Sequence, residues 1–274
     1  MYQQHVTKFD KEYQSYKFII FAVKLVQEQM EKKWFESWFN TPYYHILYKN
    51  RDNAEAALFI DNLFEHLHPD KHATLLDIAC GRGRHAKYMS DKGYNTTGID
   101  LSESSIAYAK KYENENLYFQ VQDMRQAYCN SCFDFAFNLF TSFGYFETEK
   151  EHLDALKVFN AALKPNGILV LDYFNAYKAI KDLVPTEIKN KNNITFNISK
   201  HLEGKKIHKN IEFEDDNQSH QYVEEVFAFT LQDFHSMLEQ SNFTIIEKFG
   251  NYHFQDFNQD ESQRLILICK KNHA

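Results

Sequence analysis

Short apolar runs alternate with amphipathic stretches over most of the chain. The apolar run Leu75, Leu76 and Ile78 has the pattern of a buried strand, and a helical pattern follows over residues 84–92. Further strands are predicted at residues 94–99, 117–122, 133–139 and 168–173, and further helices at 52–67, from Ser102 onward, at 147–163 and at 231–241. This alternation is typical of an α/β fold in which helices cover a mainly parallel sheet.

Residues 187–229 interrupt this alternation. Apolar and polar positions there alternate with a period of two, and the stretches Glu-Gly and Asp-Asp-Asn-Gln-Ser supply turn signals. The three strands predicted within this segment are residues 193–202, 205–215 and 221–229. They would form a small antiparallel sheet inserted after the fifth strand of the main sheet. Two later strands, at residues 243–249 and 264–270, are expected to form a hairpin.

Residues 1–51 are expected to form a helical extension. Apolar side chains share one face of a helix over residues 8–39, which favours packing on the domain over binding at a membrane surface. The most apolar run, residues 18–26, is interrupted by Lys24. It is too short to span a bilayer, which needs about 20 apolar residues.

Residues 34–51 form an aromatic-rich segment within this extension. Pro42 follows Thr41 and can open a helix at its first position, which places Tyr44 and Tyr48 one turn apart. Two interpretations remain open for the segment. It is either an amphipathic helix buried against the sheet or a lid over a ligand site.

Composition narrows the class of protein. The chain has 274 residues, enough for one large domain with an appendage, and a net charge of −7. That charge argues against broad binding to nucleic-acid backbones. Four cysteines and the absence of a cleavable signal peptide predict a reducing, cytoplasmic environment.

Two groups of side chains could suggest other chemistry. Cys129 and Cys132 have the spacing of a redox or metal motif, but they precede a strand rather than open a helix, so two free thiols are expected. His66, His68 and His72 lie in a predicted link with no acid or cysteine at ligand spacing. No metal site is therefore predicted.

The first predicted strand, the glycines that follow it and the next helix have the form of a nucleotide-type site. Glycines let the backbone approach a ligand, and a helix N-terminus favours polar or anionic groups. Asp100 ends the next strand and could accept hydrogen bonds from a ribose diol. The stretch Gly81-Arg-Gly83-Arg-His-Ala86 matches a dinucleotide fingerprint, so two ligand classes fit.

The pattern Asp77-x-Ala79-x-Gly81-x-Gly83 more closely resembles motif I of class I S-adenosylmethionine (SAM) methyltransferases. Ala79 replaces the first glycine of the motif, which is a mild departure if the backbone angles there are ordinary. The turn Lys164-Pro-Asn-Gly and the terminal hairpin are also similar to the family. The resemblance covers roughly residues 34–271. It implies a Rossmann-like sheet of order 3-2-1-4-5-7-6 over residues 52–186 and 230–274, with the insert at 187–229 shaping a substrate pocket or forming a dimer.

The resemblance also implies roles for single residues. Asp77 would lie near the methionine part of SAM, Asp100 would bind the ribose, and Leu101 would pack on the adenine. Asp123 would accept a hydrogen bond from the adenine amine, and Met124 would offer its backbone N–H. The residues expected to bind the cofactor are Tyr44, Arg51, Asp77, Ala79, Gly81, Gly83, Asp100, Leu101, Asp123, Met124, Leu139 and Phe140.

These features predict a SAM-dependent methyltransferase acting on a small molecule. The Asn/Asp-Pro-Pro-Tyr/Phe signature of nucleic-acid amino-methyltransferases is absent. A general base is needed only if the nucleophile arrives protonated. The candidates are Tyr145, Asp172, His253 and His85. The alternatives are a nicotinamide-dependent oxidoreductase and a SAM-binding protein without catalysis. Because Met30-Glu-Lys-Lys-Trp resembles the start of related enzymes, residues 1–29 would be an extension.

Overall fold

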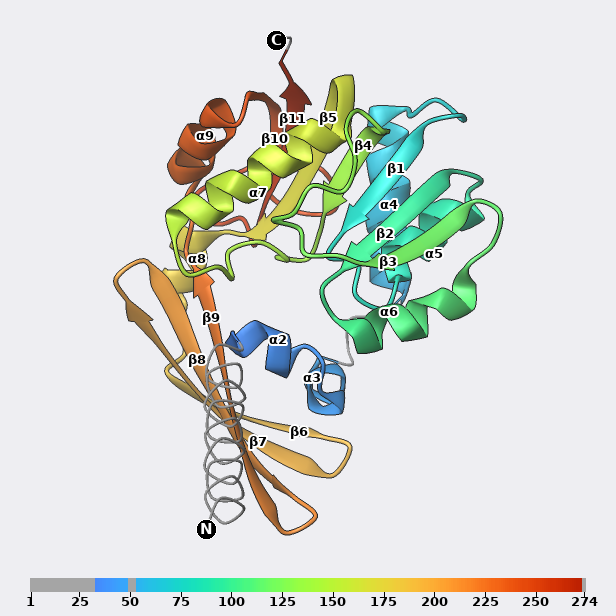
Figure 1. Ribbon diagram of the computed structural model, residues 1–274. Helices are drawn as coiled ribbons and strands as arrows, with labels where there is room; N and C mark the ends of the chain where they lie inside the picture. Colours follow the sequence, from blue (N-terminus) through green and yellow to red (C-terminus); the bar gives the residue numbers. More distant parts are fainter. Residues whose placement is uncertain (1–32, 49–52, 273–274) are drawn as a thin grey trace, which may run out of the picture.

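The computed structural model describes residues 33–48 and 53–272 (Figure 1). Most of the helix expected over residues 8–39 and the predicted site residue Arg51 lie outside these ranges. Among the described residues, no helix is both long enough and apolar enough to cross a membrane.

A seven-stranded sheet forms the centre of the main domain. Its strands lie in the order β3-β2-β1-β4-β5-β11-β10, and β11 runs in the direction opposite to that of the other six. The strands are β1 (Thr74–Ile78), β2 (Asn95–Asp100), β3 (Leu117–Val121), β4 (Phe133–Asn138), β5 (Leu163–Phe174), β10 (Phe243–Phe249) and β11 (Arg264–Lys271). Without the insert, this is the predicted order 3-2-1-4-5-7-6. The strand order reverses between β1 and β4, which is where open α/β sheets bind ligands.

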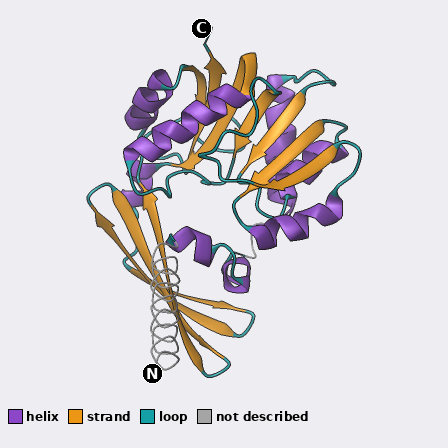
Figure 2. Ribbon diagram, viewed as in Figure 1, coloured by secondary structure: helices purple, strands orange, loops and turns teal. Residues whose placement is uncertain are grey.

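Helices cover both faces of this sheet (Figure 2). Apolar residues of α4 (Asn53–Leu67) and α5 (Arg84–Asp91) pack on one face, and those of α7 (Glu149–Ala162) and α9 (Leu231–Gln240) pack on the other. Val170 of β5 faces the first pair, whereas Leu169 and Leu171 face the second, as the two-residue period of a strand requires. The shorter helices are α6 (Glu103–Ala109), η1 (Lys110–Tyr112) and α8 (Ala176–Lys181).

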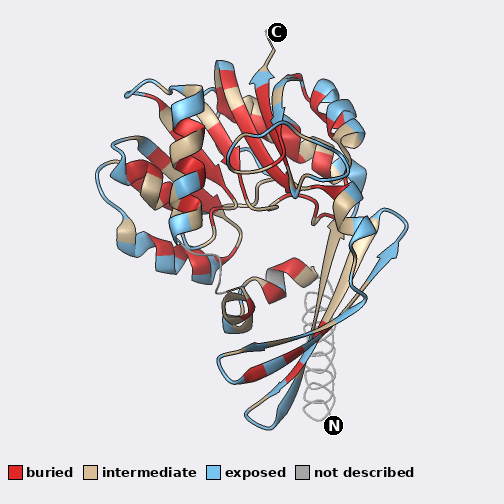
Figure 3. Ribbon diagram, turned by 180° about the vertical axis from the view of Figure 1, so that it is seen from behind, coloured by how far each residue is buried: buried red, intermediate tan, exposed pale blue. Residues whose placement is uncertain are grey.

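The insert is a separate antiparallel sheet of four strands rather than the three predicted. They are β6 (Thr186–Lys191), β7 (Ile194–Glu203), β8 (Lys206–Asp215) and β9 (Gln218–Phe227). The additional strand, β6, lies at the edge of the sheet, and its central Ile188 is 68% exposed. A mostly polar edge strand has little apolar periodicity, which is why the sequence pattern missed it. Figure 3 shows that the buried residues concentrate in the main sheet.

Two short helices, α2 (Trp34–Trp38) and α3 (Pro42–Leu47), lie between the insert and the main domain (Figure 1). As predicted, α3 begins with Pro42, and the Thr41 hydroxyl accepts a hydrogen bond from the Tyr44 N–H at 3.2 Å. Trp38 and Leu47 pack against Phe196 and other apolar residues of the insert. The aromatic segment is thus a packed structure attached to the insert sheet.

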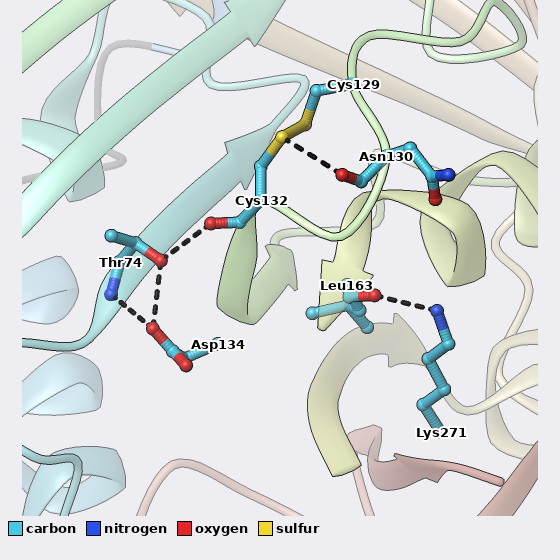
Figure 4. Close-up of a disulfide and its surroundings, with 7 residues drawn as sticks. All are labelled: Thr74, Cys129, Asn130, Cys132, Asp134, Leu163 and Lys271. Carbon is cyan, nitrogen blue, oxygen red and sulfur yellow. Dashed lines mark hydrogen bonds between the residues drawn. A yellow bond between two sulfur atoms is a disulfide. The ribbon is translucent and has the colours of Figure 1, made fainter. Parts of the chain in front are cut away.

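The loop before β4 differs from its prediction. Cys129 and Cys132 form a disulfide, with their Cα atoms 6.2 Å apart, so the expectation of two free thiols is wrong (Figure 4). Ser131 has a positive φ of 55°, and this turn folds the chain back on itself between the two cysteines. The Cys132 carbonyl also accepts a hydrogen bond from the Thr74 hydroxyl at 2.9 Å, which fixes the loop to β1.

Candidate functional site

A cavity lies at the carboxyl ends of β1, β2 and β4, where α2 and α3 form its outer wall. It encloses about 830 Å³ of atom-free space, including the part open to solvent. The residues expected to bind a cofactor that line it are Tyr44, Ala79, Gly81, Asp100, Leu101, Asp123, Met124 and Phe140. Eight of the twelve residues expected to bind a cofactor therefore share one cavity, and their role in binding stays a prediction.

The turn after β1 has an unusual backbone. Ala79 and Gly81 have φ angles of 58° and 56°, in the left-handed region. The angles at Ala79 are thus not ordinary, and its methyl group costs about 1–2 kcal/mol relative to a right-handed conformation. Nothing lies within 4 Å of where a Gly81 side chain would begin. A side chain at Gly81 would therefore start in open space at the wall of the cavity.

Asp100 lies at the wall of this cavity. One carboxylate oxygen accepts the Gly81 N–H at 2.8 Å, and the other accepts the Ser102 N–H at 2.8 Å. Burial raises the pKa of Asp100, and these two hydrogen bonds act in the opposite direction. Each carboxylate oxygen has a further lone pair, so the group can accept hydrogen bonds from a ligand hydroxyl as well.

Two of the expected cofactor residues instead support the turn from behind. Gly83 begins α5 with a φ of 78°, and a Cβ there would lie 2.5 Å from the Phe119 ring. Its small size is needed for packing against β3. Leu139 is 3% exposed and packs with the α4 side of the core. Neither residue lines the cavity.

Asp77 also lies behind the wall rather than in it. It is 1% exposed, and its carboxylate accepts the Ala86 N–H at 3.1 Å in the first turn of α5. Burial is the main cause that raises the pKa of Asp77 to about 7. In this structure Asp77 therefore caps the N-terminus of α5, the helix that follows the turn.

We expect Asp77→Asn to change the pH dependence of stability. The folded-state pKa of about 7 lies above the unfolded value of about 3.9, so the folded state binds more protons between these values and loses stability as pH rises. Asparagine can still accept the Ala86 N–H but does not ionise. Urea unfolding should show the variant more stable than wild type at pH 8, by more than about 1.4 kcal/mol, the free energy of one pKa unit. The difference should shrink toward pH 4. A variant that is less stable at every pH would contradict this account.

Asp123 lines the cavity but is already paired. Both of its oxygens accept hydrogen bonds from Arg125, at 2.6–3.1 Å, and Arg125 also contacts Glu151 at 2.9 Å. Lys33, just before α2, reaches the same Glu151 at 2.8 Å. These ion pairs connect the N-terminus of α2, through Glu151 and Arg125, to Asp123 in the cavity wall. A ligand amine that bonded to Asp123 would have to share it with Arg125.

The loop after β4 holds two consecutive residues, Phe140 and Thr141, at φ angles of 59° and 60°. Asp172 stabilises this strained loop, because its carboxylate accepts the Phe140 N–H at 2.8 Å and its carbonyl accepts the Thr141 N–H at 2.9 Å. The carboxylate is 0% exposed, and it also accepts hydrogen bonds from Arg264 at 2.8 Å and from the Tyr252 hydroxyl at 3.1 Å. Asp172 is therefore a positioning residue rather than a candidate base.

Of the other three catalytic candidates, one lines the cavity and two do not. Tyr145 lines the cavity, and its hydroxyl donates to the Thr141 carbonyl at 2.6 Å. His85 is 6% exposed behind the cavity, with its ring 5.4 Å from that of Phe140. His253 lies in the loop after β10, in a shallow pocket with Asn62 and His66, and does not reach the cavity. Its location removes the basis for a catalytic role.

His45 and Ser102 are among nine residues of the cavity wall that the sequence analysis did not name as site residues. His45 of α3 lines the cavity, and its buried Nε2 has no hydrogen-bond partner among the described residues. Burial, with a smaller contribution from Arg82, lowers the pKa of His45 to about 4, so its ring is neutral near pH 7 and can accept a hydrogen bond. The hydroxyl of Ser102, also in the wall, donates to the Asn40 side chain at 2.6 Å. The one signal in the sequence for His45 is its position directly after Tyr44 on the predicted helix.

A second cavity lies between the insert and the carboxyl end of β5. Tyr145 lines both cavities, so the two adjoin. Glu224 of β9 forms part of its wall and is held by Trp38 Nε1–H at 2.7 Å, by the Tyr48 hydroxyl at 2.7 Å and by Lys209 at 3.0 Å. Burial acts to raise the pKa of Glu224, but Lys209 and these hydrogen bonds lower it on balance. The wall of the second cavity therefore contains a negative group, a positive group and neutral polar groups.

Comparison with known proteins places these features in context. The family model of the methyltransferase domain matches residues 48–248. The dTDP-3-amino-3,4,6-trideoxy-alpha-D-glucopyranose N,N-dimethyltransferase of Streptomyces venezuelae is 30% identical over 131 residues, which are 47% of this chain and 54% of that protein. The chain thus spans about half the length of the curated relatives it matches.

Two solved structures share the fold. An S-adenosylmethionine-dependent methyltransferase from Clostridium acetobutylicum ATCC 824 aligns with a TM-score of 0.72 at 19% identity, covering 84% of this chain and 96% of that one. SAM-bound CalS10, an amino pentose methyltransferase from Micromonospora echinaspora, aligns with a TM-score of 0.62 at 18% identity, covering 81% and 93%. At these identities the likeness concerns the fold alone.

Proposed function

Because the chain belongs to the methyltransferase domain family, we propose that it is an enzyme that transfers the methyl group of SAM to a small-molecule acceptor. One observation carries the proposal. The Asp100 carboxylate lies at the end of β2, in the cavity wall, where two backbone N–H groups hold it. This is where the resemblance expects the acid that binds the ribose.

The residues of the first cavity fit SAM by their chemistry. Asp100 would accept hydrogen bonds from the ribose hydroxyls, and the side chains of Leu101 and Met124 would supply apolar surface for the adenine. Gly81 leaves room for the cofactor beside the backbone. SAM supplies a methyl group on a sulfonium, which is already a good leaving group. The task of this chain is then to hold the acceptor in line with the methyl group and to exclude water.

The aromatic segment would provide that exclusion. Phe35, Phe39, Tyr44 and His45 all reach the first cavity from α2 and α3. The Asn40 side chain joins this segment to the main domain through its contacts with Ser102 at 2.6 Å and Ser104 at 3.1 Å. We therefore propose that the segment is a lid that closes over SAM. Protease cleavage between Trp34 and Tyr48 that is equally fast with and without SAM would contradict the lid.

The second cavity is the proposed acceptor pocket. It adjoins the first cavity at Tyr145, and its Glu224 and Lys209 side chains suit a polar acceptor. Two of the proteins named above act, according to their names, on amino sugars: a dTDP-linked aminoglucopyranose derivative and an amino pentose. A screen of such amines for the formation of S-adenosylhomocysteine would identify the acceptor, and activity with none of them would favour a SAM-binding protein without catalysis.

Two finer points remain predictions. A homodimer through the insert would pair the exposed edge strand β6 with its copy, and light scattering of the purified chain tests this. A cytoplasmic location rests on the sequence alone, and cell fractionation tests it.

We expect Asp100→Ala to weaken SAM binding at least tenfold, because two ribose hydroxyls lose a charged acceptor and each such hydrogen bond contributes roughly 1.5–3 kcal/mol. Isothermal titration calorimetry with SAM measures the change, and the exposed Asp154→Ala serves as a control that should bind normally. Unchanged affinity in a folded Asp100 variant would rule out the ribose assignment. Wild-type protein that binds NAD but not SAM would instead favour the oxidoreductase.

A further inference from the structure

Three side chains with metal-binding donors meet on the hairpin of β7 and β8. His201 and His208 are directly opposite each other across the two strands, with their rings stacked at 5.0 Å and 12°. Glu203 lies two positions after His201 and therefore points from the same face of β7. The donor atoms of the three residues all lie within 4.8 Å of one another. The sheet register puts them on the opposite face from Phe196 and Ile211, which pack against α2 and α3.

The geometry of this group approaches that of a metal centre. His201 Nε2 and His208 Nε2 are each 3.8 Å from the same oxygen, Oε2 of Glu203. A tetrahedral Zn²⁺ with ligand bonds of about 2.0–2.2 Å needs its ligand atoms about 3.4 Å apart. The His201 and Glu203 side chains are 54% and 75% exposed, so they are free to turn by the small amount required.

A second carboxylate supports one of the histidines from behind. His208 is paired in register with Glu225 of β9, and its Nδ1 lies 3.5 Å from Glu225 Oε1. Glu225 is itself held by Lys206 at 3.4 Å. A carboxylate beside the second ring nitrogen is common around metal-bound histidines, because it favours the tautomer that leaves Nε2 as the metal ligand. This is an observation independent of the three-residue cluster.

We propose that His201, Glu203 and His208 bind one divalent transition-metal ion, with Zn²⁺ as the best match. Two imidazoles and one carboxylate are ligands that Zn²⁺ accepts, and water would complete the tetrahedron. The site is separate from the two cavities, since none of its three ligands lines either of them.

The position of the site indicates a structural role. Lys205, in the turn between Glu203 and Lys206, pairs with Glu149 of α7 at 2.8 Å and with Asp233 of α9 at 3.5 Å. Its carbonyl accepts the Ala228 N–H at 2.7 Å. The hairpin end therefore contacts the main domain, and an ion bound beside this turn would rigidify the contact between insert and domain.

The test is a titration of the chelator-treated, tag-free full chain with ZnCl₂ by isothermal titration calorimetry. Reduced Cys129 and Cys132 would also bind zinc, so the experiment is done in the Cys129→Ser/Cys132→Ser background. We expect one ion per chain. His201→Ala and His208→Ala should each weaken binding at least tenfold. Glu225→Gln, which removes no ligand, should weaken it by about tenfold or more.

The exposed His72→Ala serves as the matched control and should bind Zn²⁺ as the background protein does. Zn²⁺ should also raise the melting temperature of the background protein but not that of His208→Ala. Circular dichroism checks that each variant is folded. Because His201 is exposed, His201→Ala should leave the fold unchanged. No heat of binding at 100-fold excess Zn²⁺ would overturn the proposal. It would also be overturned if His201→Ala and His208→Ala bound Zn²⁺ as tightly as the background protein does.

Discussion

Gly81→Val is expected to abolish SAM binding, with the affinity reduced at least a hundredfold. A side chain at this position would start in open space at the wall of the first cavity, where the cofactor is proposed to approach the backbone. The substitution also has a backbone cost, because Gly81 has a φ of 56° and a β-branched residue is unfavourable there. Calorimetric titration with SAM measures the affinity, and circular dichroism checks the fold.

Gly204→Val separates the two effects of this substitution. Gly204 has nearly the same φ, 57°, and also has nothing within 4 Å of a new Cβ, but it lies in the β7–β8 turn, away from the cavity. The same backbone strain is thus introduced without blocking the site, and SAM binding should be retained. If Gly81→Val folds and still binds SAM normally, the glycine turn is not the cofactor site.

Arg264→Met is expected to destabilise the fold by about 3–5 kcal/mol, the usual cost of leaving a buried charge without its partner. Arg264 bonds to the Asp172 carboxylate, which is 0% exposed, at 2.8 Å through Nε and at 2.7 Å through Nη2. It also donates to the Thr141 hydroxyl at 3.1 Å, so its loss releases the strained loop at Phe140 and Thr141. Urea unfolding measures the change in the free energy of unfolding.

Lys178→Met provides the comparison for an exposed ion pair. Lys178 contacts Asp182 at 2.5 Å, but the Asp182 side chain is 52% exposed, and such pairs contribute at most about 1 kcal/mol. The double variant Asp172→Asn/Arg264→Met should recover part of the stability lost in Arg264→Met, because the buried charge is then absent. A loss below 1 kcal/mol for Arg264→Met alone would show that Asp172 does not depend on this partner.

Local pattern was sufficient for the order of elements in the main sheet. Each strand is a short apolar run between turn signals, and Pro42 after Thr41 marked the beginning of α3. The same criterion failed for β6, whose alternating positions are mostly charged or polar. The turn predicted at residues 164–167 is present although β5 begins at Leu163, because these four residues pair with neither β4 nor β11 and Asn166 has a φ of 64°. Continuous pairing of β5 with both neighbouring strands starts at Ile168, where the predicted apolar run begins.

The sequence by itself determined where the candidate site lies, because the glycine turn and Asp100 are specified by short, contiguous motifs at the ends of adjacent strands. Only the tertiary structure decided what each side chain does. Gly83 leaves space for the Phe119 ring. Asp172 pairs with Arg264, which lies 92 positions later in the sequence. The two histidines of the proposed metal site lie opposite each other on paired strands. Such partners are set by sheet register and packing between elements distant in sequence, and a local pattern carries no record of either.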